Sequence, residues 1–282
     1  MHWWDGPGVM KTMMNELAVE GRTLYAFMER NFHLVRRYLS WEIVFLFYNA
    51  INAMTIGYIG VNTPVAHRSQ TVLYLLIGAL LWGYLSLLFD EVANSISWER
   101  WEGTIEYTFM APIRRLTHLL GMCLYAAAYG VVRTVIVLGA LALFFHISLS
   151  GANLWTGVVV LIVSSVSFMG LGLIAATLPL LSTERGVQAT HIIQGLILLI
   201  SGIYYPISVL PHWVQWASYL SPATYALDMS RAALLHGATV AELAVPLVKL
   251  FAIGVLLIPV GLSVFVLAER FAMRTGRLKR NG

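Results

Sequence analysis

Charged residues are scarce in this chain: of its 282 residues only 11% are Asp, Glu, Lys or Arg, whereas 59% are hydrophobic. A soluble domain of average composition carries roughly 25% charged residues, so an ordinary cytosolic enzyme is excluded. Disorder is excluded as well, because a disordered chain combines low hydrophobicity with high net charge. The net charge is only +4, and we therefore expect no nucleic-acid partner.

The chain also lacks the residues of common catalytic and redox sites. Its one cysteine, Cys123, excludes an intramolecular disulfide and a CxxC motif, and is predicted to pack within an apolar run. HExxH, GxSxG and acyltransferase-like HxxxxD patterns are absent, and Lys11-Thr12 follows Met10 where a phosphate-binding loop requires glycine. We expect no catalytic residue, cofactor or metal site in this chain, and an integral membrane enzyme is kept only as an alternative.

What the sequence does contain is long apolar stretches. A transmembrane helix needs about 20 mostly apolar residues, and backbone groups inside a bilayer must be satisfied internally, which favours helices. Charge-free stretches, and a polar break at 148–153, predict six spans: about 41–60, 71–89, 119–145, 155–181, 188–205 and 246–268. We therefore predict an all-α membrane protein that forms a single domain over 1–282.

Most basic residues fall on one side of this predicted plan. Fourteen of the 18 Lys and Arg residues lie before the first span, between the second and third, between the fourth and fifth, or after the sixth. Cytoplasmic segments carry such an excess, so both termini are predicted to be cytoplasmic, in a multi-pass protein of the plasma or inner membrane. No compact apolar run with a small-residue cleavage site begins the sequence, so no signal peptide is expected.

The segment 10–38, before the first span, has the pattern of an amphipathic helix. Mostly apolar residues recur there at spacings of three and four: Met10, Met14, Leu17, Gly21, Leu24 and Met28. This spacing lines one helical face. Two interpretations stay open, a helix that lies in the lipid headgroup layer and a helix that also contacts a cytoplasmic partner.

The segment 93–116, between the second and third spans, is predicted to hold a second amphipathic helix on the cytoplasmic side. Trp98, Trp101 and Ile105 lie at helical spacing. An acidic stripe follows one residue further along: Glu99, Glu102 and Glu106. Pro112 limits the helix, because the residue before a proline is pushed out of the helical region. The charged face is compatible with solvent alone, whereas two exposed tryptophans favour contact with lipid or protein.

The segment 206–237, between the fifth and sixth spans, contains Pro206, Pro211 and Pro222 and therefore cannot be one continuous helix. Its aromatic residues are typical of a membrane-interface belt. Near its end, an aspartate and an arginine stand three residues apart, and we expect them to pair on its surface: Asp228 and Arg231.

Two separated runs resemble elements of a known family. The run 99–106 reads Glu-Arg-Trp-Glu-Gly-Thr-Ile-Glu, and Ala-Pro follows at 111–112. The run 202–215 reads Gly-Ile-Tyr-Tyr-Pro-Ile-Ser-Val-Leu-Pro-His-Trp-Val-Gln, with Leu-Ser-Pro-Ala-Thr-Tyr at 220–225 and Asp-Met-Ser-Arg at 228–231. The first resembles the E-R-x-x-G-T-x-E…P element of type-2 ABC exporter permeases, and the second the segment between their fifth and sixth spans. The resemblance covers nearly the whole chain.

The resemblance implies a transport subunit that works by alternating access, with ATP and Mg bound on a separate ATPase subunit present in two copies. In that family the loop between spans two and three docks into a cleft of the ATPase. The matching positions here, with two tryptophans as anchors, are Trp98, Glu99, Arg100, Trp101, Glu102, Gly103, Thr104 and Glu106. A second copy of this chain or a related permease would complete the assembly, which membrane lipids surround.

The same resemblance implies that the segment between spans five and six is a short helical hairpin that re-enters the outer leaflet and covers the exit. The external gate is then expected to comprise Tyr204, Tyr205, Pro206, Pro211, Trp213 and Pro222. The implied cargo is an amphiphilic drug, a lipid or a lipid-linked glycan, exported from the cytoplasm or inner leaflet. An ion-coupled secondary transporter is the alternative, although the paired broken spans or mid-membrane carboxylates that it would use are not evident.

Three polar residues within predicted spans are candidates for the pathway. Arg133 lies 15 residues beyond His118, or about 22 Å along a helix, which puts it near or past the bilayer centre. A charge there costs at least about 2.5 kcal/mol, so Arg133 either binds backbone carbonyls for structure or contacts a polar or anionic group of the cargo. Asn49 and Asn52 share a turn of the first span and are expected either to line the pathway or to bond between helices.

Overall fold

The computed structural model describes residues 6–62, 64–110, 114–182 and 185–275, and within α1 the side chains from residue 18 onward. These described residues form helices and connecting segments, with no strand among them. In chain order the helices are α1 (Gly6–Arg37), α2 (Leu39–Val61), α3 (Val65–Glu102), α4 (Ile105–Met110), α5 (Arg115–Phe144), α6 (Leu154–Ala175), α7 (Thr177–Leu181), α8 (Gly186–Ile200), the 3₁₀ helix η1 (Ile207–Val209), α9 (His212–Leu220), α10 (Pro222–His236) and α11 (Ala244–Arg274). The predicted all-α membrane fold is confirmed.

Among the described residues, five helical stretches are long and apolar enough to cross a membrane. They are Leu39–Val61, Arg68–Glu102, Leu116–Phe144, Leu154–Leu181 and Ala244–Arg274, which correspond to the predicted spans one to four and six. The predicted fifth span, 188–205, is the 15-residue helix α8 instead. At ~1.5 Å per residue α8 is about 22 Å long, shorter than the ~30 Å hydrocarbon core, so its length alone does not establish a sixth crossing.

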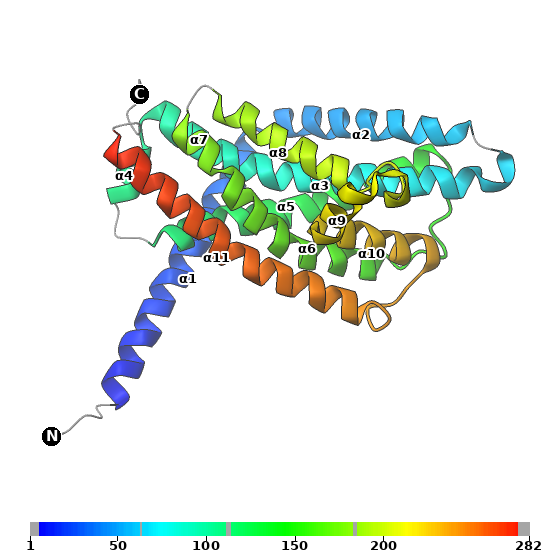
Figure 1. Ribbon diagram of the computed structural model, residues 1–282. Coiled ribbons are helices and arrows are strands. Elements are labelled where there is room, and N and C mark those ends of the chain that lie inside the picture. The colour runs from blue at the N-terminus through cyan, green and yellow to red at the C-terminus, as the bar shows by residue number, and fades with distance from the viewer. Residues whose placement is uncertain (1–5, 63, 111–113, 183–184, 276–282) are drawn as a thin grey trace.

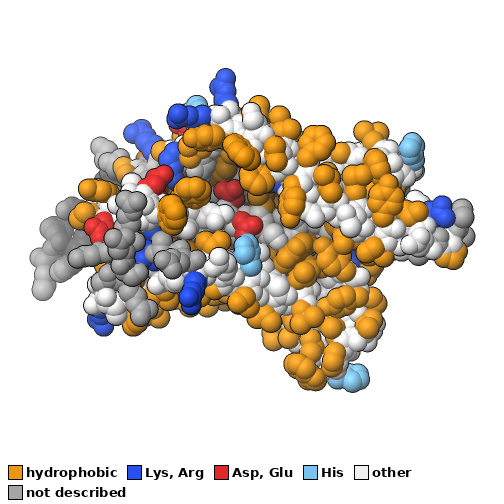
Figure 2. Space-filling view, turned by 90° about the horizontal axis from the view of Figure 1, so that it is seen from above, with side chains coloured by type: hydrophobic (Ala, Val, Ile, Leu, Met, Phe, Trp, Pro, Cys, Tyr) orange, Lys and Arg blue, Asp and Glu red, His pale blue; other side chains and the backbone are white. Residues whose placement is uncertain are grey.

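The long helices run side by side, and the bundle has two distinct ends (Figure 1). At the first, which we call the α4 end, lie α4, α7 and the end of α11; at the other, the α10 end, lie α9, α10 and the connection from α2 to α3. Among the described residues, Arg100 at the end of α3, Arg114 before α5 and Arg274 at the end of α11 lie at the α4 end. Figure 2 shows most charged side chains of one face toward this end, while hydrophobic side chains cover most of the remainder.

Helix α3 is the central element of the bundle. It is 38 residues long and contacts α2, α5, α6, α8 and α10. Its fully buried side chains include Leu76, Tyr84, Leu85, Phe89 and Ile96. Because a helix that is apolar around most of its surface is stable only when it is surrounded, this pattern accounts for the central position of α3.

Helices α6 and α11 approach each other closely along glycines, which we call the α6–α11 seam: Gly170, Gly254 and Gly261. A Cβ at Gly254 would lie 2.7 Å from the backbone nitrogen of Ser167, and one at Gly261 would lie 2.6 Å from the carbonyl oxygen of Gly170. The hydroxyl of Ser167 donates to the carbonyl of Leu250 at 2.9 Å across the seam. Small residues allow backbones to pack this closely in membrane proteins, where helix association depends on van der Waals contact.

Candidate functional site

The run that resembles a coupling element lies where α3 ends and α4 begins. Gly103 adopts a left-handed conformation, with φ of 73°, and terminates α3. The backbone nitrogen of Thr104 then donates to the carbonyl of Glu99 at 2.9 Å, which satisfies one of the carbonyls left free at a helix end. The predicted separate helix over 93–116 is therefore wrong, because its first part is the last turns of α3 and Gly103 divides it.

The tryptophans at this junction face outward. Trp98 and Trp101 are each 64% exposed, and Glu102 and Glu106 are exposed beside them, as is Tyr107. We call these five residues the α3–α4 surface. Ile105, which was predicted to continue the tryptophan stripe, is buried instead, because the turn at Gly103 rotates α4 relative to α3. Sequence reasoning missed Tyr107, although its large aromatic side chain lies one residue after Glu106.

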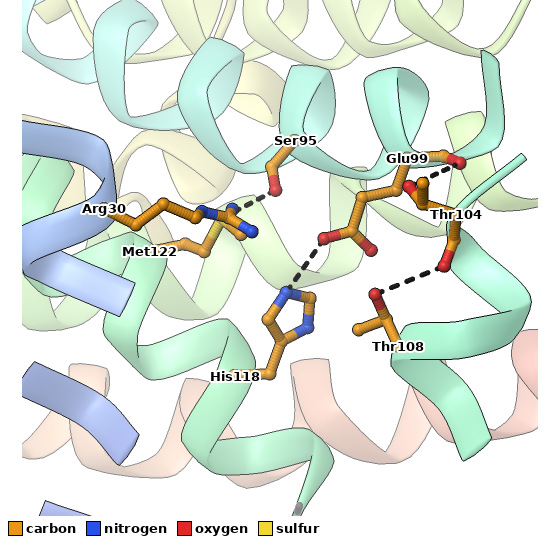
Figure 3. Close-up of polar contacts among 7 residues, drawn as sticks. All are labelled: Arg30, Ser95, Glu99, Thr104, Thr108, His118 and Met122. Atoms are coloured by element: carbon orange, nitrogen blue, oxygen red, sulfur yellow. Dashed lines mark hydrogen bonds and ion pairs between the residues drawn. The ribbon is translucent and has the colours of Figure 1, made fainter. Parts of the chain in front are cut away.

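Two other residues of the coupling element point into the bundle. Arg100 is only 1% exposed, and its Nη1 donates to the carbonyls of Pro179 at 3.0 Å and Leu180 at 2.8 Å, in the last turn of α7. Glu99 is buried, and its Oε1 lies 3.3 Å from Nε2 of His118 on α5 (Figure 3). These two side chains therefore fix the end of α3 to α7 and α5 and are not part of the exposed surface.

Helix α1 packs on the first turns of α5, close to this junction. Glu20 of α1 accepts a hydrogen bond from the hydroxyl of Thr117, and its Oε1 lies 3.1 Å from Nε of Arg114. The ring of Phe27 lies 4.8 Å from that of His118, and Figure 3 shows Arg30 of α1 reaching toward the same region. Helix α1 thus exists as predicted, whereas the apolar face proposed for it begins in residues 10–17, whose side chains lie outside the described part.

The second candidate site is a groove of about 800 Å³ on the side of the bundle, which we call the α2–α3 groove. One face of α2, from Glu42 to Ile56, and one face of α3, from Ala79 to Asn94, form its walls. Tyr129 and Arg133 of α5 and Tyr204 complete it. The groove therefore brings together all three predicted pathway residues, Asn49, Asn52 and Arg133.

The polar side chains in the middle of the groove bond mainly to α2. The side-chain amides of Asn49 and Asn52 donate to the carbonyls one turn earlier in their own helix, at 2.8 and 3.0 Å, so the described contacts do not include the expected bonds to another helix. Arg133 donates through Nη2 to the carbonyl of Phe45 at 3.0 Å, and its guanidinium lies 5.9 Å from the ring centre of Tyr129. Arg133 thus binds a backbone carbonyl, as its first interpretation expects, and it also lines the groove, whereas contact with a cargo stays a prediction.

The bond of Arg133 locates its guanidinium along α2. Phe45, its partner, lies six residues after the start of α2, or about 9 Å along it, and so short of the middle of that helix. The depth of Arg133 in the bilayer stays a prediction.

Carboxylates gather at the end of the groove nearer to α4. Glu42 accepts a hydrogen bond from the hydroxyl of Tyr129. Asp90 accepts one from the side-chain amide of Gln194 on α8 at 2.9 Å, and Nδ1 of His191 lies 3.1 Å from the amide oxygen of Gln194. Together with Glu91, these groups make this end of the groove acidic, a feature that the sequence plan did not predict because the three acids fall on two helices.

The comparison with known proteins adds a family assignment to this geometry. The family model for the ABC-2 type transporter matches residues 22–235, which include α2 to α9, all but the last residue of α10, and both candidate sites. The chain belongs to this family. ABC-2 permeases are membrane transport subunits, not catalysts, and normally work with an ATPase subunit. No curated protein shows significant similarity to the chain.

In this ABC-2 permease, each proline of the predicted external segment begins a helical piece. Pro206 precedes η1, Pro211 precedes α9 and Pro222 is the first residue of α10, as expected for a residue whose φ is preset and whose missing N–H is not needed there. Pro222 is buried, whereas Pro206, Pro211 and Trp213 are exposed at the α10 end. Tyr204 borders the α2–α3 groove, and the hydroxyl of Tyr205 donates to the carbonyl of Leu199.

Asp228 and Arg231 of this permease attract each other, but the prediction that they pair on the surface is wrong for Arg231, which is buried. Arg231 is only 9% exposed; its Nη2 donates to the carbonyl of Ile203 at 2.8 Å, and its guanidinium lies 3.5 Å from the ring centre of Tyr74 on α3. Burial lowers the pKa of this guanidinium from its ordinary value, but an arginine stays charged at neutral pH. Arg231 of α10 therefore contacts two other elements at the α10 end: α3, and the segment that follows α8.

Proposed function

We propose that this ABC-2 permease is the membrane subunit of an ATP-driven exporter that moves an amphiphilic drug, a lipid or a lipid-linked glycan out of the cytoplasm or inner leaflet. ATP and Mg are bound on a separate ATPase subunit. Two permease copies, identical or related, and two ATPase subunits form the complex in the cell membrane, with the α4 end and both termini in the cytoplasm.

One observation carries this proposal: a single unbroken helix, α3, connects the two candidate sites. Its last turns present Trp98 and Trp101 on the α3–α4 surface, and its residues from Ala79 to Asn94 form a wall of the groove. A displacement of its exposed end is therefore passed directly to the groove wall, because a continuous helix moves as a rigid element.

The α3–α4 surface suits a protein partner better than solvent. Aromatic side chains surrounded by charges are characteristic of interface anchors, and charged groups set the register with a partner. Gly103 and Thr104 shape the turn that presents Glu102 and Glu106, while Glu99 and Arg100 act from inside as positioning residues. All eight predicted coupling residues thus retain a role, but the role of two of them is indirect.

At the α10 end, Tyr204 contributes to the groove while Pro206, Pro211 and Trp213 lie outside it. We assign these residues, with Tyr205 and Pro222, to an external gate that covers the exit of the groove. Asn49, Asn52 and Arg133 then lie on the path between the acidic end of the groove and this gate.

The test uses charge reversal on the α3–α4 surface. Glu102→Lys and Glu106→Arg are expected to reduce co-purification of the ATPase subunit with the tagged permease, or to leave ATP hydrolysis uncoupled from export in proteoliposomes. Glu242→Lys, which reverses an exposed acid at the opposite end, is the matched control and should behave like the original protein. Unchanged assembly and transport in both surface variants would exclude this docking site, and export without any ATPase subunit would support the ion-coupled alternative.

A further inference from the structure

The shape of the α2–α3 groove fits an elongated, mostly apolar ligand. Its walls extend from Glu42 to Ile56 on α2 and from Ala79 to Asn94 on α3, about 20 Å along each helix at ~1.5 Å per residue. Its volume of about 800 Å³ lies within the range of small-molecule sites, which are mostly apolar with a few placed polar groups. The carboxylates of this groove are concentrated at one end.

The charges that face the groove are unbalanced. Three carboxylates, those of Glu42, Asp90 and Glu91, line it against one guanidinium, that of Arg133. Arg133 bonds to a backbone carbonyl and forms no ion pair with these acids within the described part of the chain. Among the described residues that line the groove, acids therefore outnumber bases by three to one.

The carboxylates differ in how they are satisfied. Glu42 accepts from Tyr129 and Asp90 accepts from Gln194. Glu91 is half-buried and accepts no hydrogen bond from any residue that the structure describes. A charged group out of bulk water is costly unless it is paired. A cation bound beside Glu91 would therefore stabilise the charged form of its carboxylate.

The walls beside the acids are aromatic. Phe45 and Tyr48 of α2, Trp82 of α3 and Tyr129 of α5 all line the groove, and aromatic faces attract cations as well as apolar groups. In addition, the buried hydroxyl oxygen of Ser86, on the same wall, has no hydrogen-bond partner among the described residues. The groove therefore holds both components of a site for a hydrophobic cation.

We propose that the α2–α3 groove binds a hydrophobic organic cation, with its positive group at Glu42, Asp90 and Glu91 and its apolar part against the aromatic walls. This inference rests on the proposed export function and narrows its substrate class: among amphiphiles it selects cationic ones and disfavours cargo with a phosphate group. The excess of carboxylates in the groove is the observation that favours a cation over a neutral or anionic ligand.

The test compares two ions of nearly the same size and shape but opposite charge, tetraphenylphosphonium and tetraphenylborate. Their binding to the purified full-length permease in a non-ionic detergent is measured by equilibrium dialysis, without nucleotide or ATPase subunit. We expect tetraphenylphosphonium to bind roughly tenfold more tightly or better, which corresponds to about 1.4 kcal/mol. Equal binding of the two ions would overturn the proposal. Binding of neither ion would overturn it as well, and it is the result expected if lipid or a second copy of the chain fills the groove.

Two variants with opposite expected effects localise the site. Glu91→Gln keeps the shape of the side chain and should weaken tetraphenylphosphonium binding about tenfold, whereas Arg133→Gln removes the groove's cation and should strengthen it. Glu242→Gln, at the α10 end, should change nothing. A merely structural role would not give effects of opposite sign. If both groove variants keep the original melting temperature and the original affinity, the cation does not bind here and the proposal fails.

Because the assay needs neither ATP nor transport, its outcome is independent of the coupling test. If the chain binds the cation selectively but assembles with no ATPase subunit, the proposed ATP-driven export is refuted and the proposed cation site stands. If the complex exports some cargo with ATP but the permease shows no preference between the two ions, the proposed cation site is refuted and the proposed export function stands.

Discussion

Three arginines that the sequence analysis singled out share one kind of partner. Arg100, Arg133 and Arg231 all donate to backbone carbonyls, in α7, in α2 and in the segment after α8. A guanidinium has five donors in a rigid plane and always keeps its charge, so it suits carbonyls whose own helical donors are missing or that have a free lone pair. The sequence revealed that one of these charges, that of Arg133, lies among apolar residues, but not which carbonyl each arginine meets.

At Arg231 this arrangement leads to a stability prediction. Arg231→Gln removes a charge-assisted hydrogen bond to Ile203 and the contact with Tyr74, so it should lower the free energy of unfolding by about 2 kcal/mol. The measurement is thermal unfolding of the purified permease in detergent. Asp228→Asn, which alters the exposed neighbour that was expected to pair with it, is the control and should stay within about 0.5 kcal/mol. Equal melting temperatures for the two variants would contradict the buried role of Arg231.

Candidate residues were predictable from the sequence only where a single helix decides their position. Trp98 and Trp101 are exposed together, and Asn49 and Asn52 share a groove face, because helical spacing alone places them so. Glu99 belonged to the same acidic stripe as Glu102 and Glu106 but is buried, since its environment is set by α5, which is remote in sequence. Periodicity describes one helix and contains no information about which neighbour covers it.

At the scale of elements, apolar runs and prolines located most helices correctly. The five long helical stretches match predicted spans, and the segment 206–237 with its three prolines is not one continuous helix, as predicted. The fifth span was overestimated because residues 201–205 are free of charge, although α8 ends at Ile200. The length of a charge-free run sets an upper limit for a helix and does not locate its end.

The segment just after α8 packs against α3, and this contact yields a second prediction. A Cβ at Gly78 of α3 would overlap the carbonyl oxygen of Ile203, so Gly78→Ala should destabilise the permease by about 1 to 3 kcal/mol, as expected for overpacking. Gly195→Ala in α8, where no other atom lies within 4 Å, is the control and should be neutral or stabilising by up to about 1 kcal/mol. Thermal unfolding measures both, and a similar effect of the two substitutions would argue against the close packing at Gly78.

At the scale of the whole molecule, the α6–α11 seam separates a pair of helices that is expected to be rigid from the helices that line the groove, which are expected to move. The glycines of the seam leave no room between the two backbones, so α6 and α11 are expected to move as one body. If the groove rearranges during transport, the elements expected to move are those that line it: α2, α3, α5 and the segment after α8.

This division can be measured with pairs of spin labels. Labels at the exposed positions Ile162 on α6 and Leu256 on α11 should report the same distance with and without ATP in the assembled transporter. Labels at Ile51 on α2 and Ile162 should report a change. The native Cys123 is buried and will not compete for the label. A nucleotide-dependent shift between α6 and α11 as large as that of α2 would show that the seam does not hold them together.

The length of α3 bears on the reach of its exposed end. Its 38 residues extend about 57 Å at ~1.5 Å per residue, and about 53 Å of this lies along the membrane normal at the average tilt of ~20°. A bilayer with its headgroups is only ~40–45 Å thick. If α3 starts at the opposite headgroup layer, its last turns emerge into water, and under the proposed coupling a protein, not lipid, is then the surface that covers Trp98 and Trp101.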